Sequence, residues 1–144
     1  MPIKCLTLCA ALIAIAGSAT GHAAAGAARG RGLLLLRFDD RHFTSWEENL
    51  PLFEKYGAHA TFFINGAIDD QALAAMKRLK AAGHSLGAHG VGHRKAVEAL
   101  QTMGEQAYLE RELRPQLVAA ETAGMPLRHF AYPCSQRDAR SDAL

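Results

Sequence analysis

The chain has 144 residues, a formal net charge of +2 and 21% charged residues. This length accommodates at most one ordinary domain. Lys and Arg are scattered and form no basic stripe with interleaved aromatic residues, which argues against a nucleic-acid partner.

The first 25 residues have the layout of a secretory signal peptide. After a positively charged start, residues 5–17 are apolar and uncharged, and the small residues at 23–25 resemble a cleavage site. The apolar run is shorter than the ~20 residues of a spanning helix, so a membrane anchor is the less favoured alternative. We therefore predict a signal peptide at 1–25, a flexible leader at 26–32 and a secreted or periplasmic domain at 33–144, with no membrane span after signal removal.

The first elements of the mature chain follow this leader. The continuous apolar run at 32–38 predicts a strand that is buried on both faces. A helix is expected from Thr44, whose hydroxyl suits a helix start, to Tyr56, because Gly57 favours a helix end. Pro51 should bend this helix or delay its start.

The later elements continue the alternation of strands and helices. Strands are predicted at 59–64, 84–88 and 129–132, and helices from Asp69 or Asp70 to 82–83 and at 94–123, the latter with breaks near Gly104 and Pro115. The order β-α-β-α-β-α-β predicts a parallel sheet with helices outside it. Four parallel strands form an open sheet and cannot close a barrel.

Polar residues follow the predicted strand ends. Asp39 and Asp40 follow the first strand, Asn65 the second and His89 the third. Functional residues of parallel α/β sheets gather at the carboxyl ends of the strands, so these positions predict a site.

The residue types at these ends point to a metal-dependent hydrolase. One of two adjacent carboxylates can bind a cation while the other takes a proton from water. His89 and His93 have the i, i+4 spacing of metal ligands, but Gly90 and Gly92 between them are poor helix formers, so a tight turn or a helix start is expected. Alone, either pair is more often an ordinary surface feature; together they favour a catalytic metal site with open coordination positions.

These residues resemble the polysaccharide deacetylase family, carbohydrate esterase family four. The first family motif, Thr-Phe-Asp-Asp, is matched by residues 37–40, and the second, His-x-x-x-His, by residues 89–93. The resemblance extends over residues 33–133. It implies a distorted (β/α) barrel, of which this chain would hold about four β/α units as an open, partial barrel.

The resemblance also implies the reaction and its residues. The expected activity is hydrolysis of N- or O-acetyl groups on an acetylated polysaccharide or oligosaccharide, with a divalent metal, zinc being the first expectation. The implied roles are general base for Asp39, metal ligands for Asp40, His89 and His93, backbone oxyanion donor for Cys134, and substrate binding for Tyr132 and Pro133.

The chain departs from the family pattern at several positions. Arg37 replaces the motif Thr, Arg41 replaces a Gly, and the Arg that orients the base is absent from the third motif, which aligns with residues 131–135. The last two motifs, including a His general acid, should lie beyond Leu144. We therefore expect a C-terminally incomplete domain with reduced or no activity. The alternative is a non-catalytic, exported module that binds metal or carbohydrate.

Overall fold

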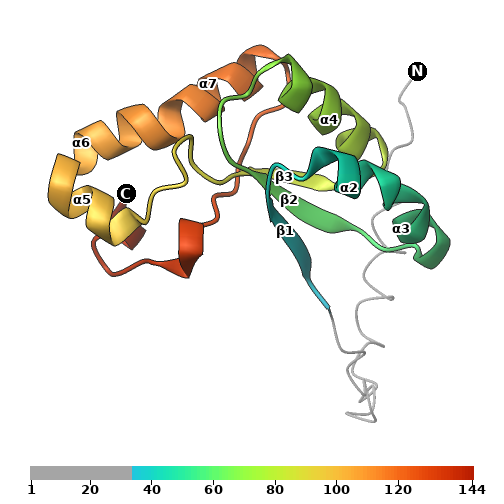
Figure 1. The fold of residues 1–144 in the computed structure, drawn as a ribbon, viewed down its shortest axis with the longest axis horizontal. Helices are drawn as coiled ribbons and strands as arrows, with labels where there is room; N and C mark the ends of the chain where they lie inside the picture. The colour runs from blue at the N-terminus through green and yellow to red at the C-terminus, as the bar shows by residue number, and fades with distance from the viewer. Residues whose placement is uncertain (1–33) are drawn as a thin grey trace, which may run out of the picture. The chain divides into compact units, whose positions relative to one another are not determined.

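A computed structural model describes residues 34–144, so the predicted signal peptide and leader lie outside the described residues. Strands β1 (Leu36–Asp40), β2 (Ala60–Ile64) and β3 (Ser85–Ala88) form a parallel sheet in the order β1-β2-β3 (Figure 1). Asp40 pairs with Ile64, and Ile64 pairs with Ala88, so the carboxyl ends of the strands lie in line. The predicted α/β class and parallel sheet are confirmed.

Helices connect and follow the strands. They are α2 (Phe43–Glu48), α3 (Leu50–Tyr56), α4 (Asp70–Ala81), α5 (Ala96–Met103), α6 (Glu105–Tyr108), a π-helical turn (Leu109–Leu113) and α7 (Arg114–Thr122), with 3-10 turns at Pro133–Ser135 and Ser141–Ala143. In Figure 1, α2 to α4 lie on one side of the sheet, and α5 to α7 follow one another in an arc. None of the helices within residues 34–144 is long and apolar enough to cross a membrane.

Local sequence explains where several helices begin and end. The single helix expected at 44–56 is two helices that meet at Asn49, and Pro51 lies in the first turn of α3, where its missing N–H is tolerated. Gly57 ends α3 with a left-handed φ of 56°. Asp69 caps α4, because its carboxylate accepts the Ala72 N–H at 2.9 Å.

The core lies between the sheet and helices α2 to α4. Alternate residues of β2, Phe62 and Ile64 among them, point to these helices and are fully buried. Trp46 of α2 packs on Phe62 with ring centroids 4.9 Å apart, and Met76 of α4 belongs to the same cluster. Phe63, on the other face of β2, is half-buried.

Two predictions about strands were wrong. The first strand begins at Leu36 and is not buried on both faces: Leu34 and Leu35 are 78% and 81% exposed. Within the described residues, β1 is an edge strand that pairs with β2 alone. An apolar run in the sequence does not determine whether other elements cover it. The expected fourth strand at 129–132 is one parallel bridge between Ala88 and Phe130, because Pro133 starts a 3-10 turn.

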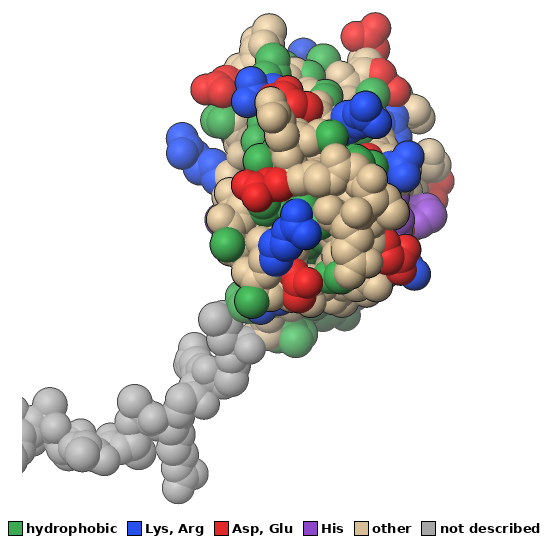
Figure 2. Space-filling view, turned by 90° about the vertical axis from the view of Figure 1, so that its left-hand side faces the viewer, with side chains coloured by type: hydrophobic (Ala, Val, Ile, Leu, Met, Phe, Trp, Pro, Cys, Tyr) green, Lys and Arg blue, Asp and Glu red, His purple; other side chains and the backbone are tan. Residues whose placement is uncertain are grey.

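The surface that carries α5 and α6 has mixed charge. Figure 2 shows Lys and Arg side chains interspersed with Asp and Glu over this side of the molecule. Ion pairs join Lys95 to Glu98 at 3.1 Å and Arg114 to Glu110 at 3.2 Å. Exposed pairs of this kind contribute little to stability, so the core holds the fold together.

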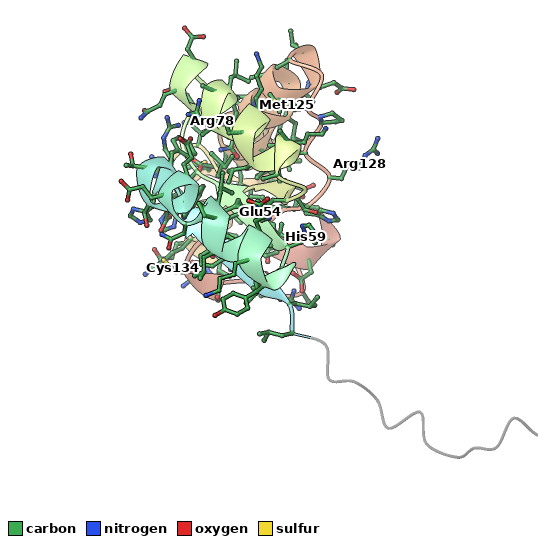
Figure 3. The ribbon with its side chains drawn as sticks, turned by 90° about the vertical axis from the view of Figure 1, so that its right-hand side faces the viewer. Glu54, His59, Arg78, Met125, Arg128 and Cys134 are labelled. Carbon is green, nitrogen blue, oxygen red and sulfur yellow. The ribbon has the colours of Figure 1, made fainter. Side chains whose placement is uncertain are left out.

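A cavity of about 480 Å³ lies at the amino-terminal edge of the sheet. It is lined by Glu54 and His59, both labelled in Figure 3, and by Phe53 and His84. His84 is buried, its ring meets Phe53 edge-on at 4.8 Å, and its Nδ1 accepts the Ala60 N–H at 3.3 Å. Burial lowers the pKa of His84 below its ordinary value of 6.5, and the neighbouring charge of His59 lowers this pKa further.

This burial predicts a pH-dependent stability. Because the pKa of His84 is lowered in the folded chain, His84 takes up a proton more readily in the unfolded chain. The folded protein therefore has its full stability above the unfolded pKa of 6.5, where His84 is neutral in both states, and loses stability as pH falls below that value. We expect the free energy of unfolding to fall between about pH 7 and about pH 5, and His84→Asn to flatten this dependence in urea titrations. His42→Asn, at an exposed histidine, is the control. Equal pH dependence of the unfolding free energy in wild type and His84→Asn would contradict the prediction.

Candidate metal centre

Three predicted ligands meet at the carboxyl edge of the sheet. Asp40 ends β1, His89 follows β3, and His93 lies in the turn after it. One ligand atom of each lies within 4.8 Å of the others. Asp40 Oδ1 is 3.3 Å from His93 Nε2 and 3.9 Å from His89 Nε2. One carboxylate oxygen and two imidazole nitrogens are a donor set that suits zinc and similar divalent cations.

A backbone carbonyl fixes the orientation of His89. The side chain is buried, and its Nδ1 lies 2.7 Å from the carbonyl oxygen of Ala131. A carbonyl only accepts, so Nδ1 must carry the proton and donate it. On the neutral ring Nε2 then carries the lone pair, and it lies 3.9 Å from Asp40 Oδ1. Metal-binding histidines commonly have their other ring nitrogen held by a carbonyl in this way.

Unusual backbone conformations gather around the same residues. Among residues 34–144, the non-glycine residues with positive φ are Asp40 at 86°, His93 at 50°, Cys134 at 56° and Ser135 at 53°. The first three were singled out for this site by the sequence. Each such conformation costs about 1–3 kcal/mol and persists only where the surroundings impose it, which is common at functional sites.

Asn65, at the end of β2, completes the surroundings of Asp40. Its Nδ2 donates a hydrogen bond to Asp40 Oδ1 at 3.0 Å. Arg41, an exception to the family pattern, holds the segment after Asn65: its Nη2 donates to both carboxylate oxygens of Asp69, at 3.0 and 2.9 Å. The residue that replaces the family Gly therefore has a structural partner.

Asp39 lies beside the cluster with one oxygen engaged and one free. Its Oδ2 lies 2.5 Å from the guanidinium of Arg37 and 3.9 Å from His89 Nε2. Its Oδ1 is buried and has no hydrogen-bond partner among the described residues. A buried oxygen without a partner is costly and typically awaits a ligand or a proton. Arg37, which replaces the motif Thr, thus supplies an arginine to this carboxylate.

The remaining predicted residues lie in the segment after the β-bridge. Pro133 adjoins the histidine turn, since a Cβ built on Gly90 would lie 3.9 Å from its ring. Cys134 (Figure 3) is exposed and its thiol is free. The hydroxyl of Tyr132 donates to the Ser141 carbonyl at 2.6 Å, which occupies it within the protein. The substrate-binding and oxyanion roles of these residues stay predictions.

The site fits a divalent cation by its own chemistry. The Nε2 atoms of His89 and His93 and the Asp40 carboxylate converge, and Asp39 Oδ2 lies 3.9 Å from His89 Nε2. A cation held by Asp40, His89 and His93 would lower the pKa of a bound water toward ~7 and polarise a carbonyl group.

Sequence reasoning missed two residues that contact the histidine turn. Glu112 and Gln116 are buried polar residues four positions apart, and both hydrogen-bond to the glycines between the histidines. Their spacing puts them on one helix face, but nothing in that spacing identifies a partner some 20 to 26 residues away.

The chain belongs to the polysaccharide deacetylase family, whose model matches residues 26–144. No curated protein sequence matches the chain.

Solved structures of this family share the fold. A carbohydrate esterase domain of a multidomain xylanase, from the hindgut metagenome of Trinervitermes trinervoides, is 26% identical, with a TM-score of 0.58 over 73% of this chain and 50% of that one. A family 4 carbohydrate esterase from Streptomyces lividans, in complex with acetate, is 22% identical, with a TM-score of 0.63 over 78% and 57%. A family 4 pseudoenzyme from Bacillus anthracis is 18% identical, with a TM-score of 0.64 over 78% and 39%. The chain thus spans between 39% and 57% of the length of these structures.

The orientation of His89 gives a direct spectroscopic prediction. We expect nitrogen NMR of the metal-free chain to show the neutral form of His89 as the tautomer with a protonated Nδ1 and an unprotonated Nε2, because the Ala131 carbonyl accepts from Nδ1. The exposed His42 serves as the internal reference. A protonated Nε2 on a neutral His89 would contradict the geometry.

Proposed function

We propose that this chain is the metal-binding, base-carrying part of an exported hydrolase that removes N- or O-acetyl groups from a polysaccharide or oligosaccharide. The observation that carries the proposal is the convergence of Asp40, His89 and His93, with the Asp39 carboxylate 3.9 Å from His89 Nε2. The substrate class follows from the family and from the carbohydrate esterases that share the fold. Export rests on residues 1–25 of the sequence.

Each residue of the site has a distinct role in this proposal. Asp40, His89 and His93 hold the cation, with zinc the first choice for one carboxylate and two imidazoles. Asp39 is the general base: its carboxylate accepts a proton from the attacking water, and Arg37 holds the Oδ2 atom that lies 3.9 Å from His89 Nε2. The backbone N–H of Cys134 donates to the oxyanion that develops on the acetyl carbonyl.

Turnover requires a further group besides the metal ligands and the base. Hydrolysis of an acetamide requires an acid that protonates the leaving amine. Within residues 34–144, the cluster of potential metal ligands contains Asp40, His89 and His93 and no further histidine. A pseudoenzyme also shares this fold. We therefore expect metal binding with slow or no turnover from this chain.

Zinc affinity tests the metal site. We expect the chain to bind one equivalent of zinc in a chelator competition, and His93→Ala to weaken binding by at least roughly tenfold, because one of three ligands is lost. His42→Ala, at an exposed histidine, is the matched control and should leave the affinity unchanged. Absence of zinc binding, or equal affinity of wild type and His93→Ala, would refute the proposed site.

The role of Asp39 is tested separately from metal binding. Asp39→Asn keeps the shape of the side chain but removes its basicity, so we expect unchanged zinc affinity. Where the wild type releases acetate from acetylated chito-oligosaccharide, the variant should release it about 100-fold more slowly. Acetate can be measured with a coupled enzyme assay over long incubations. Zinc binding without any acetate release by the wild type would favour the non-catalytic binding module.

A further inference from the structure

The segment between the two histidines is held by one stretch of helix. The Gly90 N–H donates to Gln116 Oε1 at 3.0 Å, and the Gly92 N–H donates to Glu112 Oε2 at 2.7 Å. The Val91 N–H donates to the backbone carbonyl of Glu112 at 3.0 Å. All three amides of the spacer therefore have partners on two residues that lie one helical turn apart.

Gln116 ties this spacer to the end of β2. Its Nε2 donates to the carbonyl oxygens of Ile64 at 2.8 Å and Gly66 at 2.7 Å, while its Oε1 accepts from Gly90. Two carbonyls require donors and one amide requires an acceptor, so the orientation of the side-chain amide is determined. The fully buried Gln116 thus links the strand end that carries Asn65 with the turn that carries the histidines.

Glu112 occupies the space that the two glycines leave free. A Cβ built on Gly92 would lie 2.6 Å from Glu112 Oε1, and one on Gly90 would lie 3.1 Å from Oε2. The carboxylate is buried, and Arg94 Nε at 3.3 Å and the Gly92 N–H compensate its charge. Glu112 belongs to the π-helical turn, an irregularity that occurs frequently at functional sites.

We propose that Glu112 and Gln116 are positioning residues: they hold the spacer so that His89 and His93 face Asp40, and thereby set the metal affinity of the site. His93 follows Gly92 directly and has a positive φ, so the position of the Gly92 amide determines where the His93 ring can lie. The inference deepens the proposed function and rests on it for the identity of the ligand as a divalent cation.

Paired substitutions distinguish positioning from general stability. Glu112→Met removes the acceptor at similar volume and should weaken zinc binding about tenfold or more, whereas Glu112→Gln keeps an acceptor oxygen and should restore affinity to within a few-fold. Gln116→Met should weaken binding similarly. Glu110→Met, at an exposed residue of the same turn, is the control. The absorption spectrum of bound cobalt reports the ligand geometry independently; it should change in Glu112→Met and Gln116→Met and stay as in the wild type in Glu110→Met.

Gly92→Ala tests the same contact with the buried helix residues unchanged. The φ angle of Gly92 is not positive, so an alanine there suits the backbone conformation, and its methyl group conflicts with the Glu112 carboxylate. This variant should fold even where Glu112→Met does not, and it should lose zinc affinity about tenfold.

Hydrogen exchange of the metal-free chain separates this inference from the proposed function. We expect the Gly92 amide to lose protection in Glu112→Met and Gly92→Ala, and the Gly90 amide to lose it in Gln116→Met, while the amides of β2 stay protected. A wild type that binds no zinc but shows these losses would refute the proposed function and support the positioning of the spacer. The role of Glu112 would be overturned if Gly92→Ala kept the zinc affinity and cobalt spectrum of the wild type. It would also be overturned if the Gly92 amide stayed protected in Glu112→Met and Gly92→Ala. The role of Gln116 would be overturned if Gln116→Met kept the zinc affinity and cobalt spectrum of the wild type, or if its Gly90 amide stayed protected.

Discussion

The parallel direction of the three strands is the constraint on which the rest of the structure depends. Parallel strands in register place their carboxyl ends at one edge, and here Asp40, Ile64 and Ala88 are aligned partners. The residue that ends β1 and the residue that follows β3 are 49 positions apart in the chain, yet Asp40 Oδ1 and His89 Nε2 lie 3.9 Å apart. The site is therefore a consequence of sheet topology before it is a consequence of any single side chain.

The chain accepts unfavourable local features at this edge and compensates them with polar contacts. Positive φ at Asp40 and His93 and an unpartnered oxygen on Asp39 all oppose folding. The opposing contributions are the buried aromatic core between the sheet and helices α2 to α4, and the hydrogen bonds of Asn65 and Gln116 at the strand ends. Strain concentrated at one edge, with a regular core elsewhere, is the distribution expected of a functional site.

Sequence predicted the parts of the site that follow from strand ends. Asp39, Asp40, Asn65 and His89 stand at strand ends, so the topology of the sheet brings them together, and His93 follows His89 by four residues. Glu112 and Gln116 could not be predicted, because they act on backbone amides across the fold and their partners are set by how α7 packs. The buried first strand and the fourth strand were mistaken for a related reason: residue type alone does not determine what covers Leu35 or how far Phe130 pairs beyond one bridge.

The most direct test of this account is the position of bound zinc. Crystals of the described domain soaked in zinc, with diffraction measured on both sides of the zinc absorption edge, would locate the ion without assumptions about ligands. The account predicts one strong anomalous peak within about 2.0–2.2 Å of the Asp40 carboxylate and of the Nε2 atoms of His89 and His93. A peak elsewhere, or none at a zinc concentration that saturates the protein in solution, would contradict it.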